Sequence, residues 1–254
     1  MVEFLRLLLT KFGINAVPIG GFVFAGWSWA TALTIYWIEN LVGSLLIALR
    51  IALHRRLTHT RGHARAQLGV TTTISGSVSH KEQGFGSFFS EFLVGSLIFT
   101  LAHGLFLGLV LIVIVRALPD VEQFRTGALA VLAFLLFDFA IDLIRIKQRP
   151  FVWIKRLAQV AFGRIVLVHL AIIFGVMLAA YSERGDVFFL PFAFFKLLAD
   201  LGSILGRRDA SQSTPRWLIT LMNRLKPGED FGAYVAVEQA KERKRAAEDE
   251  EVMG

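Results

Sequence analysis

Residues 27–53 read WSWATALTIYWIENLVGSLLIALRIAL. This stretch is long and apolar enough to cross a bilayer as a helix, since about 20 apolar residues span the hydrocarbon core. Glu39 and Asn40 lie near its middle. A carboxylate at membrane depth costs about 2.5 to 3.5 kcal/mol on insertion scales. We therefore expect other parts of the chain to supply partners for Glu39.

The composition is that of a membrane protein. Of the 254 residues, 55% are hydrophobic and 23 are Phe, and the mean hydropathy is +0.59. The absence of Cys excludes disulfides, thiolate metal sites and cysteine nucleophiles. The net charge of +7 indicates Lys and Arg beside anionic lipid headgroups, and we expect no nucleic-acid partner. Arg6 and Lys11 interrupt the first apolar run, so we expect no cleavable signal peptide.

Six apolar stretches predict an all-α, polytopic membrane protein with six transmembrane helices in residues 1–208. Pro18 and the paired glycines after it predict a kinked or broken first helix, because proline removes a backbone donor. The polar residues 54–85 are predicted to form a loop. The predicted spans are residues 2–26, 28–50, 86–116, 126–146, 159–181 and 186–206.

Residues 209–254 are predicted to form a cytoplasmic tail. Within it, residues 215–226 fit an amphipathic helix lying at the membrane interface. One face of that helix is apolar, and basic side chains are available to lipid headgroups. Beyond Gly232 the blocks of charge predict a solvated helix that frays into disorder. The apolar face carries Trp217, Leu218, Leu221 and Leu225, and the basic residues are Arg216, Arg224 and Lys226.

The distribution of Lys and Arg predicts the orientation of the bundle. The segments 50–81 and 145–156 carry six and five of these residues, and the tail from Arg207 carries nine. The loops on the opposite side carry only three, Arg116, Arg125 and Arg184. Because cytoplasmic loops are enriched in Lys and Arg, both termini are expected in the cytoplasm. We therefore expect a multi-pass protein of the plasma (inner) membrane.

Titratable residues lie close to the middle of five of the six predicted spans. Counting Glu39 and Asp138 against Lys196 leaves one uncompensated negative charge in this layer. Buried charges must be paired, protonated or bound to a cation, so we expect a proton, an ion or a metal there. The middle layer consists of Glu39, Asn40, His103, Asp138, His169 and Lys196. A second layer, nearer the cytoplasm, consists of Glu91, Asp142, Arg164 and Asp200. Arg164 is expected to pair with one of the three carboxylates in that layer.

Three functions fit this polar layer. The first is proton-linked handling of an ion or small solute, since intramembrane acids and histidines are typical relay groups. The second is membrane redox chemistry with a divalent metal or haem held by His103, His169 and Glu39. The third is a structural or accessory subunit in which the layer fixes helix register. The histidines at 54, 59 and 63 are interpreted as cytoplasmic charge, without metal.

Four groups of residues resemble a signature of uncharacterised prokaryotic integral membrane proteins, a domain of unknown function. The resemblance covers residues 10–206 and leaves the tail outside. It implies the membrane fold and location but no activity. Asp138 and Asp142 are not part of the signature. The residues that carry it are Tyr36-Trp37-Ile38-Glu39-Asn40, Phe88-Phe89 with His103-Gly104, Gly163-Arg164 with His169, and Lys196 with Asp200.

Overall fold

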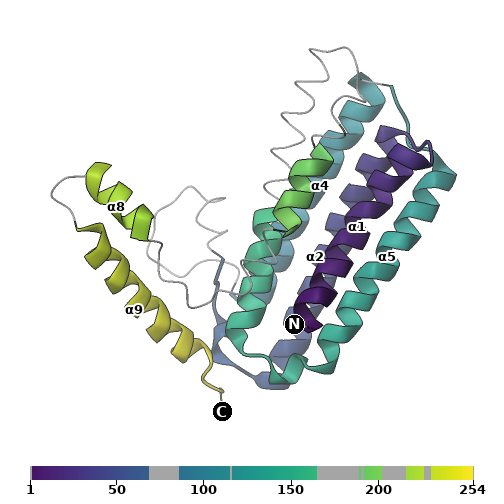
Figure 1. Ribbon diagram of the computed structural model, residues 1–254. Coiled ribbons are helices and arrows are strands. Elements are labelled where there is room, and N and C mark those ends of the chain that lie inside the picture. Colours follow the sequence, from purple (N-terminus) through teal and green to yellow (C-terminus); the bar gives the residue numbers. More distant parts are fainter. Residues whose placement is uncertain are drawn as a thin grey trace.

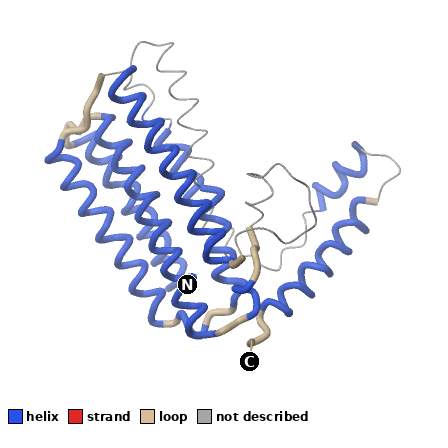
Figure 2. Tube along the Cα trace, turned by 180° about the vertical axis from the view of Figure 1, so that it is seen from behind, coloured by secondary structure: helices blue, strands red, loops and turns tan. Residues whose placement is uncertain are grey.

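The computed structural model shows a bundle of long helices, with a helical arm beside it (Figures 1 and 2). Within the part of the chain that it describes, the elements are helices and one isolated β-bridge, so the fold is all-α. The described residues are 2–68, 86–114, 116–164, 189, 192–201, 216–225 and 230–253.

Helix α1 (Val2–Phe24) is continuous through Pro18, so of the two predicted alternatives, a kinked or a broken helix, the broken helix is wrong. The chain then reverses in a tight turn in which Gly21 O accepts from Ala25 N and Trp27 N, at 3.1 and 2.9 Å. Gly26 has φ +67°, which a residue with a side chain rarely adopts. A Cβ on Gly21 would collide with the Trp27 ring, so the turn packs directly on α1.

Helix α2 (Trp29–Thr58) begins at Ser28, whose hydroxyl accepts from Thr31 N at 3.1 Å. It ends at His59, which has the left-handed φ of 53° and donates its backbone N–H to Arg55 O. The helix ends eight residues beyond the predicted span, which ended at residue 50. No Gly or Pro interrupts residues 51–58, and Thr58 Oγ1 donates to His54 O at 2.8 Å. Residues 54–58 are therefore helix, not loop.

Helix α4 (Phe88–Leu109) starts after Ser87, whose hydroxyl accepts from Ser90 N, and continues into the π-helical turn η2 (Val110–Ile114). Helix α5 (Val121–Ile144) begins five residues before the predicted start at 126. The reason is the cap at Asp120, whose carboxylate accepts from Gln123 N at 2.8 Å. A short turn, η3 (Ile146–Gln148), leads from α5 to the helical residues 151–164.

Four described helices are long and apolar enough to cross a membrane, as expected of a membrane protein. Helix α2 contacts α1, α4 and α5, and these helices lie side by side in Figure 1. Outward-facing apolar side chains such as Leu105, Leu129 and Phe137 are exposed, which suits contact with lipid. The predicted spans 159–181 and 186–206 lie partly outside the described residues. The apolar segments are Leu5–Phe24, Trp29–Thr58, Phe88–Val113 and Val121–Ile144.

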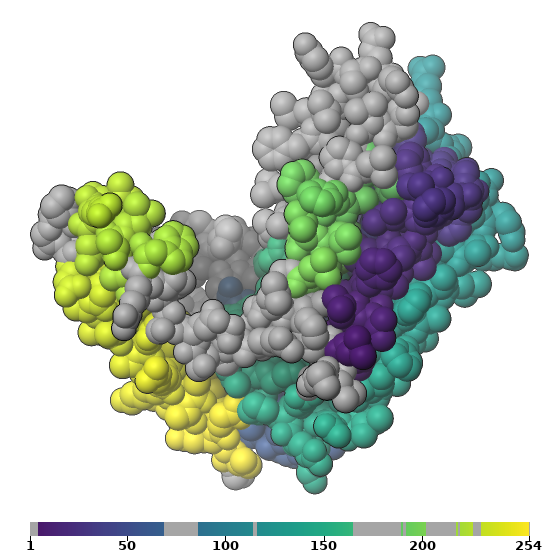
Figure 3. Space-filling model, viewed as in Figure 1, coloured from purple at the N-terminus to yellow at the C-terminus, as the bar shows by residue number. Residues whose placement is uncertain are grey.

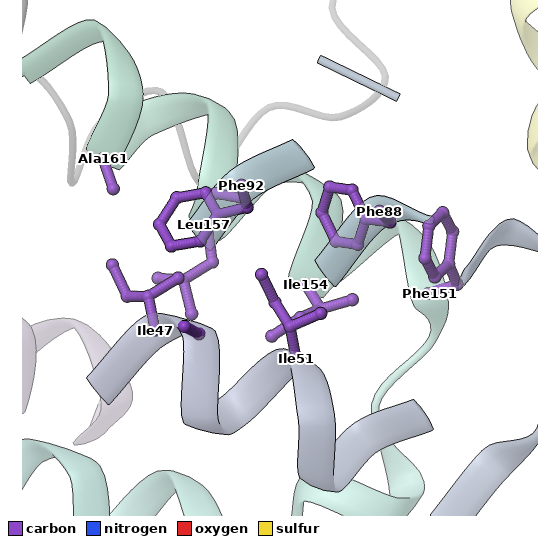
Figure 4. Packing of buried hydrophobic residues seen from close by; sticks show 10 residues of the cluster. Ile47, Ile51, Phe88, Phe92, Phe151, Ile154, Leu157 and Ala161 are labelled. Carbon is purple, nitrogen blue, oxygen red and sulfur yellow. The ribbon is translucent and has the colours of Figure 1, made fainter. Parts of the chain in front are cut away.

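A buried apolar cluster joins α2 to α4 and to residues 151–164 at the end of the bundle near the chain termini (Figures 1 and 4). Its largest side chains are Phe88, Phe92 and Phe151, which are fully buried. The rings of Phe88 and Phe151 meet edge to face, with centroids 5.4 Å apart. This cluster therefore holds α2, α4 and residues 151–164 together.

The tail forms α8 (Arg216–Leu225) and α9 (Phe231–Asp249), which stand beside the bundle in Figures 1 and 3. Helix α8 lies inside the range 215–226 in which the sequence predicts a helix. Helix α9 contacts the turn η1 (Arg61–Ala64), and Thr60 pairs with Val252 in the isolated bridge. The sequence predicts that the tail frays into disorder. That prediction is wrong for the last turn of α9 and for the residues after it, which contact the bundle.

Candidate functional site

Lys196 lies at the centre of a group of buried polar side chains. Its ammonium lies 2.8 Å from Glu39 Oε2 and 2.8 Å from Asp200 Oδ2. It also donates to Asn15 Oδ1 at 2.9 Å, so its three protons meet three different side chains. The ring of Tyr36 covers the same ammonium, with the centroid 4.6 Å from Nζ. Lys196, Glu39 and Asp200 have no solvent exposure.

Arg164 is the second cation of this group. Its Nη1 lies 3.3 Å from Glu39 Oε1 and 3.4 Å from Asp200 Oδ1, so it bridges the same two carboxylates as Lys196. The prediction that Arg164 pairs with Glu91, Asp142 or Asp200 is confirmed, and the partner is Asp200. Asn15 Nδ2 donates to Asp200 Oδ2 at 2.9 Å. We call Asn15, Glu39, Arg164, Lys196 and Asp200 the central ion cluster.

The central ion cluster has no surplus of negative charge, which corrects the count made from the sequence. Two carboxylates face the cations of Lys196 and Arg164, and Lys11 Nζ approaches Asp200 Oδ1 at 3.8 Å. The sequence count included Asp138 and placed Arg164 and Asp200 in a separate layer. It also left out Lys11 and Asn15. These residues are four apart on α1, and Asn15 Nδ2 donates to Lys11 O. A spacing of four residues puts two polar side chains on one helix face, and this was the sequence signal that could have identified Lys11 and Asn15 as site residues.

Asp138 does not lie with Glu39 and Lys196, so its predicted place in the middle layer is wrong. Its carboxylate pairs with Arg6 Nη1 and Arg50 Nη2, each at 3.2 Å. Asp142, one turn further on α5, pairs with Arg6 Nη2 and Arg50 Nε, each at 3.0 Å. Two carboxylates and two guanidinium groups therefore balance one another. The error arose because Arg50 was interpreted as a basic flank and Arg6 was not considered as a partner.

The predicted inner layer is also divided. Arg164 and Asp200 belong to the central ion cluster, and Asp142 belongs with Arg6 and Arg50. Glu91, at the start of α4, is buried elsewhere: its Oε2 accepts from the backbone N–H of Gln67 at 2.6 Å and of Leu68 at 2.9 Å. The layer was predicted from the depth of each residue along its helix. The direction in which each side chain points around the helix was not included, and it separates these four residues.

Asn40 and His103 are buried on the facing helices α2 and α4. Where these two helices meet, Trp37 Nε1 donates to Thr100 O at 2.9 Å, and a Cβ on Gly104 would lie 2.5 Å from the Trp37 ring. The helices are therefore in close contact here. Within the described residues, Asn40 Oδ1 and the hydroxyls of Tyr36 and Thr100 are buried without a hydrogen-bond partner.

The predicted metal or haem site is not assembled in the described part of the chain. His169 lies outside the described residues. Glu39 is engaged by Lys196 and Arg164. Among the residues that the structure describes, no group of three or more His, Asp or Glu could hold a metal ion.

His54 and His63 are buried and bonded to each other, which corrects their interpretation as cytoplasmic charge. His54 Nδ1 lies 2.8 Å from His63 Nε2, and His54 Nε2 lies 2.9 Å from Arg149 O. Because a carbonyl only accepts, His54 carries its proton on Nε2, and His63 Nε2–H donates to His54 Nδ1. Burial, together with the nearby His54 and Arg55, lowers the pKa of His63 to about 3. Both rings are neutral at pH 7, and only His59 is exposed.

Residues 8–247 match the model of a family of unknown function, DUF6498. The chain belongs to this family. The match extends through α8 and most of α9, so the tail belongs to the family domain, although the resemblance seen in the sequence ended at residue 206. Neither the comparison with curated proteins nor the comparison with solved structures gave a match.

Proposed function

We propose that this member of the DUF6498 family is a multi-pass protein of the plasma (inner) membrane that handles an ion or small solute in a proton-linked manner at the central ion cluster. One observation carries the proposal: Lys196 is buried and shared by two carboxylates, Glu39 of α2 and Asp200 of the helical residues 192–201. Ionisable residues inside membrane spans are costly and are typical of ion and proton paths.

The sharing of cations gives a physical route from protonation to helix movement. Lys196 and Arg164 each bridge Glu39 and Asp200. A proton on Glu39 would remove its charge, and both cations would then be held by Asp200 alone. Since these residues come from three different segments, a change in pairing shifts the relative stability of two helix arrangements. Lys11, whose side chain is 14% exposed, links Asp200 to the outside of the cluster.

Buried polar atoms without a partner, on α2 and α4, support a site for water or a polar solute. Asn40 and Tyr36 lie one turn apart on α2, on either side of Glu39, and Thr100 lies on the facing helix α4. Their hydroxyl and carbonyl oxygens have no partner among the described residues. Buried polar atoms of this kind are commonly satisfied by bound water or ligand.

The proposal can be tested with purified protein in vesicles that contain a pH-sensitive dye. Proton movement is followed after an imposed membrane potential and after inward gradients of a panel of ions and small solutes. Glu39→Gln should abolish the proton movement, because Gln keeps hydrogen bonds and loses the titrating group. Glu122→Gln, at an exposed carboxylate in the first turn of α5, is the matched control and should behave as wild type. Wild-type vesicles that move no protons under any gradient would contradict the proposal.

The charge balance of the cluster favours a second candidate, a structural or accessory membrane subunit. Every charged group of the central ion cluster faces an opposite charge, as in a lock that fixes helix packing. In that case Glu39→Gln lowers thermal stability, and neither wild type nor variant moves protons in the vesicle assay.

We further propose six spans with both termini in the cytoplasm, and α8 at the interface with anionic lipid. Helix α8 exposes Trp217, Leu221 and Leu225, which are 68%, 44% and 67% exposed, and its last turn carries Arg224. Apolar and basic side chains together suit the headgroup region. Reporter fusions test the topology: junctions near residues 150 and 230 should report the cytoplasm, and one near residue 120 the opposite side.

A further inference from the structure

The last residues of the chain form a strap across the loop that follows α2. Arg61 N donates to Glu251 O at 2.8 Å, and Met253 N donates to His59 O at 3.0 Å, on either side of the bridge between Thr60 and Val252. This is a short antiparallel pairing between segments about 190 positions apart. We call residues 248–253 the C-terminal strap and residues 59–68 its seat.

The carboxylates of the strap have specific partners on the bundle. Glu250 accepts from Phe151 N at 2.8 Å and Val152 N at 3.0 Å, and so caps the helical residues 151–164. Asp249 is buried and accepts from Gln67 Nε2, with each carboxylate oxygen at 3.1 Å. Three basic side chains also face the strap: Arg61 lies 3.0 Å from Glu251, and Arg65 and Lys155 lie 3.5 and 4.0 Å from Asp249.

The His54–His63 pair connects the two surfaces that the strap contacts. His63 belongs to the seat, and its ring packs against Phe151, with centroids 4.9 Å apart. His54 donates to Arg149 O, two residues before the N–H group that Glu250 caps. The pair therefore ties the seat to α2 and to the start of residues 151–164.

The pair tolerates no further proton in this arrangement. A proton on His54 Nδ1 would face His63 Nε2–H at 2.8 Å, where two donors cannot bond. A proton on His63 Nδ1 would be buried, and this atom has no hydrogen-bond partner among the described residues. The charged groups facing the pair are Arg55 of α2 and Glu250 of the strap, whereas Arg149 contributes its backbone carbonyl. Helix α4 and residues 151–164 present the apolar rings of Phe88 and Phe151 to His63.

We propose that the C-terminal strap is an acid-released latch and that the His54–His63 pair is its proton sensor. In the docked state the pair stays neutral, whereas exposed histidines gain protons below about pH 6.5. By linkage, a single proton taken up on release raises the ratio of released to docked strap about tenfold between pH 7.5 and pH 5.5. Exposed Asp and Glu remain charged in this range, since their ordinary pKa values are about 4. Release would free the N–H groups of residues 151 and 152 and would separate the basic side chains Arg61, Arg65 and Lys155 from the carboxylates of the strap.

The test uses the full chain in lipid nanodiscs. Because the chain has no Cys, Gln148→Cys and Met253→Cys, both at exposed positions, place two nitroxide labels uniquely. Pulsed electron paramagnetic resonance then measures the distance distribution at pH 7.5 and pH 5.5. The docked strap gives one narrow distance, and the released strap gives a broad one. Glu250→Gln, which weakens the cap, raises the released fraction at both pH values and makes the ratio measurable.

The expected result is an increase of about tenfold in the released-to-docked ratio on acidification. His63→Gln should keep the strap docked at pH 7.5, because its amide N–H replaces Nε2–H, and should reduce the pH dependence. His54→Asn is a second variant that removes the other titrating ring. His59→Asn is the matched control, since His59 is exposed and Asn tolerates its positive φ, and it should retain the tenfold change. A wild-type ratio that is equal at the two pH values overturns the proposal, as does an undiminished change in both His63→Gln and His54→Asn.

Discussion

The central ion cluster and the junction between the strap and its seat bury polar groups in two different ways. In the cluster, full charges from three segments and the amide of Asn15 satisfy one another around Lys196. At the junction, neutral histidines, backbone N–H groups and partly exposed ion pairs share the bonding, and three of the four acidic residues in the strap retain some exposure.

The difference follows from the surroundings. Inside a membrane span no water replaces a lost partner, so removal of one charge leaves another without compensation. At the end of the bundle a released group reaches water, and the loss is limited to the net free energy of the bonds broken. We therefore expect substitutions in the central ion cluster to lower the stability of the protein strongly. At the junction we expect smaller losses and a dependence on pH.

The largest expected effect comes from removing the shared cation. Lys196→Met keeps the length of the side chain but leaves Glu39 and Asp200 with Arg164 as their shared buried cation. Breaking a buried pair costs about 3–5 kcal/mol, so the variant should unfold at a much lower temperature or fail to accumulate. Thermal denaturation in detergent measures this. Lys241→Met, on the exposed face of α9, is the matched control. Equal melting temperatures for Lys196→Met and wild type would mean that the ammonium is not buried between the carboxylates.

A smaller loss is expected at the junction when its packing is disturbed. A Cβ on Gly62 would collide with the Phe151 ring. Overpacking of this kind costs about 1–3 kcal/mol, so Gly62→Ala should lower the free energy of unfolding and displace the turn η1. Gly108→Ala, where no atom lies within 4 Å of the added Cβ, is the control and should be neutral or stabilising. If both substitutions are neutral, the seat does not pack on Phe151 in the folded protein.

The pH dependence of the free energy of unfolding should depend on His63, which lies at the junction. The pKa of His63 is lowered to about 3, so between pH 6.5 and 3 the unfolded chain binds a proton that the folded chain does not. Stability therefore falls as the pH falls through this range. Between pH 7.5 and 5.5 the contribution of this group is about 1.4 kcal/mol. Denaturant titrations at the two pH values should show that loss in wild type and a smaller one in His63→Gln. A variant that loses as much as wild type would exclude His63 as the group responsible.

The smallest of these effects is expected for the cap supplied by the strap. Glu250→Ala removes the acceptor of two backbone N–H groups at Phe151 and Val152. Loss of a helix cap costs about 0.5–2 kcal/mol, and we expect about 1 kcal/mol here because water can replace the carboxylate. Hydrogen exchange at residues 151 and 152 should become faster. Glu238→Ala, at an exposed position in the middle of α9, should leave those amides unchanged.

Much of the architecture followed from residue type and period alone. Long apolar stretches must satisfy their backbone groups internally, so they form helices, and four of the predicted spans are such helices. The helix boundaries did not follow from the apolar pattern. The start of α5 depends on the cap at Asp120, and the end of α2 on the turn at His59, and the apolar pattern records neither.

The sequence alone determined that the polar side chains in the apolar stretches need partners, because an isolated charge is too costly in lipid. It also determined that Arg164 has a carboxylate within reach, as Asp200 provides. Only the tertiary structure decided which charges meet. Lys11 and Asn15 join Asp200, whereas Asp138 turns to Arg6 and Arg50. The strap and the buried pair of His54 and His63 were likewise decided by contacts between distant segments. The physical reason is that depth along a helix can be counted from a sequence, whereas the direction of a side chain around the helix acquires meaning only when a neighbouring helix faces it.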